Sequence, residues 1–77
     1  MPGKAAKAGP GLSEDEAVEH VRNRGDVIAR DMSIAKRIAE RAGEAPPAWD
    51  PAHGPGQKPH YHPTGPSGDR VGGHVLY

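Results

Sequence analysis

The sequence contains neither cysteine nor phenylalanine, and its only aromatic residues are one tryptophan and two tyrosines. Without cysteine, the chain forms no disulfide bond, no thiolate-ligated zinc site and no thiol nucleophile. Hydrophobic residues occupy 34% of the 77 positions, so we expect one small domain with a thin core.

The sequence also has no excess of charge of either sign, since ten basic side chains balance ten acidic ones. It therefore lacks the overall basic signature of a nucleic-acid-binding protein, and any contact with phosphate has to be local. No apolar run is long enough to span a membrane and no signal peptide is recognisable, so we expect no membrane span. If the protein is exported, the information for export is expected to lie elsewhere, on a longer parent chain.

Glycine and proline are abundant, with 11 and 9 residues, and they divide the chain into segments. Residues 1–12 are expected to be a flexible lead or linker, because they are mostly small residues, glycine and proline. The domain is then expected to span residues 13–77. Within it, residues 44–59 show neither helical nor strand periodicity. They predict a long irregular loop that Trp49 anchors to the core.

A first helix is predicted after residue 12. Ser13 and Glu16 have the spacing of a capping box, and Gly25 is a natural stop. His20 is expected at the edge of the apolar stripe of this helix, as a surface or half-buried residue.

A second helix is predicted to begin at Asp31 or Ser33 and to run to about Ala42, with one apolar face. Between the helices, Val27 and Ile28 favour a short strand.

Two more strands are expected in the histidine-rich end, residues 53–77. Residues 60–62 read HYH and residues 74–77 read HVLY, and a glycine-rich connection over residues 63–73 suits a hairpin loop. The predicted fold is α+β, with two helices packed on a short, about three-stranded antiparallel sheet and long Pro/Gly-rich loops.

Four of the five histidines lie between positions 53 and 74, and this cluster is the main functional signal. His60 and His62 project from the same face of an extended strand, with Tyr61 on the other face. Histidine exchanges protons near neutral pH, and cleavage of RNA without a metal needs a base for the ribose 2′-hydroxyl and an acid for the leaving oxygen. The set His60, His62 and His74, with His53 as a further member, is therefore our first hypothesis for acid–base catalysis.

Other residues of this end are suited to binding an RNA substrate. Lys58 and Arg70 are candidate phosphate contacts, and Tyr61 or Tyr77 is a candidate base-stacking surface. Under this hypothesis no cofactor is needed.

A metal site remains an alternative, with His60, His62 and His74 as ligands of a divalent metal such as zinc. In that arrangement His53 is another candidate third ligand, and Asp50 or Asp69 supplies a carboxylate. Such a site would also hydrolyse phosphodiesters. Each histidine taken singly is equally well explained as a structural residue. A non-enzymatic interaction module that folds on a partner also stays open, because the chain has few apolar residues.

The histidine-rich end carries a family resemblance. The pattern resembles the C-terminal toxin domains of bacterial polymorphic toxins, which are contact-dependent or secreted and have an HG…PHYHP…GHxxY ending. The likeness covers roughly residues 13–77, its specific part is the last 25 residues, and Leu76 stands where an aromatic residue is expected. The matching stretches are DVIA at 26–29, Ala35 with residues 38–39, HG at 53–54, PHYHP at 59–63 and GHVLY at 73–77.

The resemblance implies an antibacterial toxin that acts in interbacterial competition and is delivered into the target cytoplasm as part of a larger protein. It implies a nuclease activity, more often on RNA than on DNA, and a cognate immunity protein that neutralises the domain. The implied site falls on His53, His60, His62 and His74.

Overall fold

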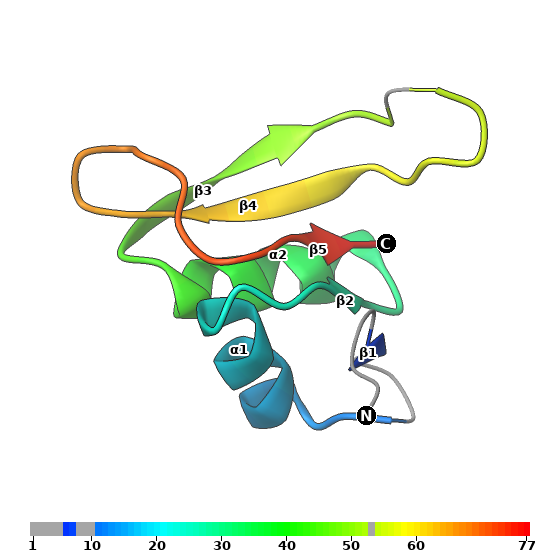
Figure 1. The fold of residues 1–77 in the computed structure, drawn as a ribbon, viewed down its shortest axis with the longest axis horizontal. Helices are drawn as coiled ribbons and strands as arrows, with labels where there is room; N and C mark the ends of the chain where they lie inside the picture. Colours follow the sequence, from blue (N-terminus) through cyan, green and yellow to red (C-terminus); the bar gives the residue numbers. More distant parts are fainter. Residues whose placement is uncertain (1–5, 8–10, 53) are drawn as a thin grey trace.

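The structure, a computed structural model, describes residues 6–7, 11–52 and 54–77. Two helices pack against one face of a mixed sheet, which confirms the α+β fold (Figure 1). The elements in chain order are β1 (Ala6–Lys7), α1 (Glu14–Arg22), β2 (Val27–Ile28), α2 (Met32–Ala42), β3 (Ala45–Asp50), β4 (His60–Thr64) and β5 (Val75–Leu76).

The sheet has more strands than the three predicted, and it is not purely antiparallel. Its order is β1-β2-β5-β4-β3. β4 pairs antiparallel with β5, as expected of the predicted hairpin, and also with β3, which was not predicted. β2 pairs parallel with β5 and with β1. The last strand in the sequence, β5, therefore lies in the middle of the sheet.

The irregular loop predicted for residues 44–59 is wrong in its first half, which forms β3. Pro46 and Pro47 argue against a strand because they have no N–H to donate, but an edge strand such as β3 needs only some of its N–H groups. The pairing with β4 is irregular between Ala45 and Ala48. Trp49 does not anchor this segment in the core, because it is 47% exposed.

The helix starts follow the sequence closely. Ser13 and Glu16 form the complete capping box of α1, and Asp31 rather than Ser33 caps α2 by accepting from the N–H of Ile34. α1 ends at Arg22, three residues before the predicted stop at Gly25, with its C-cap at Asn23.

The core lies between α2 and the sheet. Ala35, Ile38 and Ala39 of α2 are fully buried, and they share one cluster with Tyr61 of β4 and Val75 of β5. Figure 1 shows the helices on one side of the strands. Since side chains alternate along a strand, the neighbours of these buried residues point to the side of the sheet that the helices leave uncovered.

Of the predicted lead, residues 1–12, the structure describes Ala6–Lys7, which pair with β2, and residues 11–12, of which Leu12 packs against the core. Among the residues described, no helix is long and apolar enough to cross a membrane.

Candidate functional site

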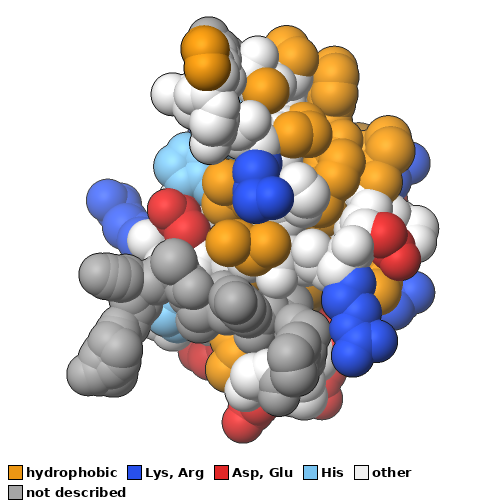
Figure 2. Space-filling model, turned by 90° about the vertical axis from the view of Figure 1, so that its right-hand side faces the viewer, with side chains coloured by type: hydrophobic (Ala, Val, Ile, Leu, Met, Phe, Trp, Pro, Cys, Tyr) orange, Lys and Arg blue, Asp and Glu red, His pale blue; other side chains and the backbone are white. Residues whose placement is uncertain are grey.

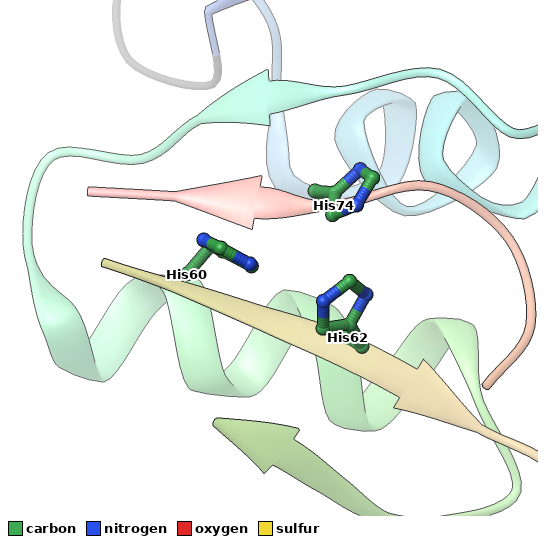
Figure 3. Close-up of side chains that lie close together, drawn as sticks. All are labelled: His60, His62 and His74. Atoms are coloured by element: carbon green, nitrogen blue, oxygen red, sulfur yellow. The ribbon is translucent and has the colours of Figure 1, made fainter. Parts of the chain in front are cut away.

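Three histidine side chains converge on the uncovered side of the sheet (Figure 3). His60 and His62 are two residues apart on β4 and therefore share a face. The pairing of Tyr61 with Val75 brings His74, one residue before β5, opposite His62. The ring centroids are 4.4 Å apart for His62 and His74, 4.9 Å for His60 and His62, and 5.4 Å for His60 and His74. The structure thus brings together the three histidines that the sequence predicts as a set.

Asp26 holds His74 in place. Its Oδ1 accepts from the backbone N–H of His74 at 3.0 Å and lies 2.9 Å from Nδ1 of the same residue. A carboxylate oxygen only accepts, so Nδ1 carries the proton in this contact, and Nε2 is left for chemistry. Sequence reasoning missed Asp26, because it lies 48 residues away and meets His74 only through the parallel pairing of β2 with β5.

Asp50, at the end of β3, is the second carboxylate of the site. Its Oδ2 lies 3.0 Å from Nε2 of His62 and 3.5 Å from Nε2 of His60. Arg70 approaches the same carboxylate with Nη1 at 3.1 Å and Nη2 at 3.3 Å. Asp50 therefore links two histidines to the guanidinium group of Arg70. It lies beside the histidines because it pairs with His60 across β3 and β4.

His60 has a second defined contact. Its Nδ1 lies 3.1 Å from the carbonyl oxygen of Lys58. A carbonyl oxygen only accepts, so Nδ1 is again the protonated nitrogen and Nε2 is the nitrogen that faces Asp50.

Burial and charge shift two groups of the site. Burial lowers the pKa of His62, and the nearby His74, Arg70 and His60 lower it further, which favours the neutral ring near neutral pH. For Asp50, burial alone would raise the pKa. The attraction of Arg70, His62 and His60 outweighs it, and the pKa lies below its ordinary value. The site therefore holds an ionised carboxylate beside a neutral imidazole.

These side chains line a pocket of about 620 Å³. Arg70 stands on its rim with its side chain 54% exposed, and the predicted phosphate contact Lys58 also lines it. Figure 2 shows the molecule from the side. Histidine, acidic and basic side chains lie next to each other at the left of this view, and most hydrophobic side chains gather toward the upper right. The pocket is open to solvent and large enough for part of a nucleotide.

The two predicted stacking residues lie elsewhere. Tyr61 is 5% exposed and belongs to the core on the helix side of the sheet. The ring of Tyr77 lies 6.0 Å from that of Tyr61, and its hydroxyl accepts from Nε1 of Trp49 at 2.6 Å. Neither tyrosine lines the pocket. His53 falls outside the described residues, and Asp69 lies in an exposed turn and does not line the pocket.

The three histidines also have the spacing of a metal-ligand set. One ring nitrogen from each lies within 4.8 Å of the others, and no further histidine or carboxylate among the described residues completes this group. The alternative ligand set predicted from the sequence is therefore geometrically compatible with a cation.

Comparison with known proteins gives no relative. No family model matches the chain, and no curated protein and no solved structure matches it. The function has to be argued from the site.

Proposed function

We propose that this domain cleaves RNA by histidine acid–base catalysis. The observation that supports the proposal most is the convergence of His60, His62 and His74 beside Arg70 in an open pocket on the uncovered face of the sheet. Transfer of a phosphoryl group within RNA needs two proton carriers and a cation, and these residues supply both without a cofactor. Local positive charge from Arg70 and Lys58 compensates for the zero net charge of the chain.

The roles of the histidines follow from their surroundings. His62, which is largely buried and kept neutral, takes the proton of the ribose 2′-hydroxyl. His74 is half exposed, and Asp26 holds its ring by Nδ1, so that its Nε2 is the donor to the leaving 5′-oxygen. Arg70, whose side chain is 54% exposed at the rim of the pocket, binds the phosphate through charge-assisted hydrogen bonds.

The family resemblance extends this proposal to biology. We infer that the domain is an antibacterial toxin, delivered into a target cell as part of a larger protein and neutralised by an immunity protein. An acidic immunity surface that covers Arg70 and Lys58 would block the pocket.

A cleavage assay tests the nuclease proposal. Purified protein is incubated with total RNA and with plasmid DNA, each with and without EDTA, beside a His60→Ala/His74→Ala double variant and a His20→Gln control. We expect RNA cleavage that survives EDTA and the control substitution but disappears in the double variant. Cleavage that needs an added metal would support the metal-dependent alternative. If neither nucleic acid is cut under any condition, the nuclease proposal is wrong and a binding module replaces it.

A further inference from the structure

The geometry points to a second property of the histidine cluster: His60, His62 and His74 bind a divalent transition-metal ion of the zinc class, and the bound ion inhibits the nuclease. The inhibitory half rests on the proposed function, whereas the metal site stands on the geometry alone.

The spacing of the nitrogens fits a small cation. Three atoms no more than 4.8 Å apart all lie within about 2.8 Å of a common point, and zinc–nitrogen bonds are about 2.0–2.1 Å long. Side-chain movements of less than about 1 Å therefore bring three imidazoles onto one ion. The ring centroids are 4.4–5.4 Å apart, a separation that suits a small cation at the centre of the cluster.

The outer contacts of two histidines are those of metal ligands. His74 gives its Nδ1 proton to the carboxylate of Asp26, and His60 gives its own to the carbonyl of Lys58. Histidine ligands usually make such a contact with the nitrogen that does not bind the metal, because the contact fixes the tautomer and makes the other nitrogen more basic. In His74, Nε2 then presents its lone pair, while Nε2 of His60 lies 3.5 Å from Asp50 Oδ2.

The carboxylates around the cluster also favour an ion. Two carboxylates lie against the cluster, Asp50 beside His60 and His62, and Asp26 beside His74. Arg70 pairs with Asp50. Asp50 Oδ2 lies 3.0 Å from Nε2 of His62 and 3.5 Å from Nε2 of His60, so it places negative charge beside the ion that the three histidines would bind.

Inhibition follows from the shared atoms. The imidazole lone pairs that would bind the ion belong to the rings that exchange protons in the proposed reaction, and a ring nitrogen bound to the ion neither accepts nor donates a proton. An occupied cluster has no free proton carrier, although its pocket stays open to substrate.

Binding is tested without any reference to cleavage. Protein stripped with EDTA is titrated with Zn²⁺ by calorimetry and with Co²⁺ by visible absorption, which reports the coordination of the ion. We expect one ion per chain, with His74→Ala abolishing binding and His20→Gln leaving it unchanged. Asp26→Asn keeps the shape of the residue but removes its charge, and we expect it to weaken binding by about 10- to 100-fold. Circular dichroism of each variant confirms that it is folded.

The functional half is tested on the same samples. We expect RNA cleavage to fall as zinc occupies the site and to return on addition of EDTA. Absence of binding, or equal binding by the wild type and His74→Ala, overturns the metal site while the nuclease proposal stands. Binding that leaves cleavage unchanged, or that activates it, overturns the inhibition. If RNA is not cut at all, the titrations still decide whether the metal site exists.

Discussion

Substitution of Gly73 by alanine should damage the site without removing any of its functional groups. The backbone of Gly73 packs against the chain that precedes β2. A Cβ added there would overlap the carbonyl oxygen of Gly25 and would lie 2.7 Å from its carbonyl carbon. Both obstacles are backbone atoms, so no side-chain rotation relieves the clash.

The size of the effect follows from this geometry. A real Cβ essentially never approaches another heavy atom closer than 3.0 Å, so the two segments must separate. The residue that follows, His74, receives two contacts from Asp26 across this junction, at 2.9 and 3.0 Å. A separation of about 1 Å weakens both hydrogen bonds. Overpacking of this kind costs about 1–3 kcal/mol of unfolding free energy.

Urea unfolding and the RNA cleavage assay, carried out together on Gly73→Ala, measure the two effects. Gly54→Ala is the matched control, because its added Cβ meets nothing within 4 Å. We expect Gly73→Ala to lose stability and cleavage while Gly54→Ala keeps both. A Gly73→Ala protein as stable and as active as the wild type would show that the close contact of these segments, and the support of His74 by Asp26, are unimportant.

Two further predictions concern the scaffold. Ile38 is completely buried, so Ile38→Ala should cost about 2–5 kcal/mol of unfolding free energy in urea titrations, whereas Met32→Ala, at a position 51% exposed, should change it by less than about 0.5 kcal/mol. Hydrogen bonds from Arg37 and Arg41 lower the pKa of Glu14 below its ordinary value of 4.5. The ionised carboxylate of Glu14 therefore stabilises the fold at pH values above 4.5. This stabilisation is lost as the pH falls through the lowered pKa of the folded state. The melting temperatures of the wild type and Glu14→Gln should accordingly differ at pH 7 and converge in acid; an equal gap at both would contradict this assignment.

Local patterns predicted the parts of this fold that depend on neighbours in sequence. The capping box of Ser13, the strand at Val27 and the shared face of His60 and His62 are set within a few residues, and all three are present. The prolines of β3 misled the prediction because the tolerance of a strand for proline depends on its place at the edge of the sheet, which a local pattern does not contain.

The site was predicted in the same partial way. The three histidines were found because they cluster in sequence. Asp26 was missed because its role depends on β2 pairing with β5, and Tyr61 was assigned to substrate although the alternation of β4 turns it into the core. The alternation of side chains along a strand predicts that Tyr61 lies on the other face of the sheet from His60 and His62. The sequence does not show which of the two faces the helices cover.

The central place of β5 has a consequence for how the domain assembles. Without it, β1-β2 and β3-β4 are two separate ribbons with no hydrogen bonds between them. β5 joins them, buries Val75 and holds His74 against Asp26. The pairing of β3 with β4 by itself brings together only Asp50, His60 and His62, so the strand that closes the sheet is also the strand that completes the site.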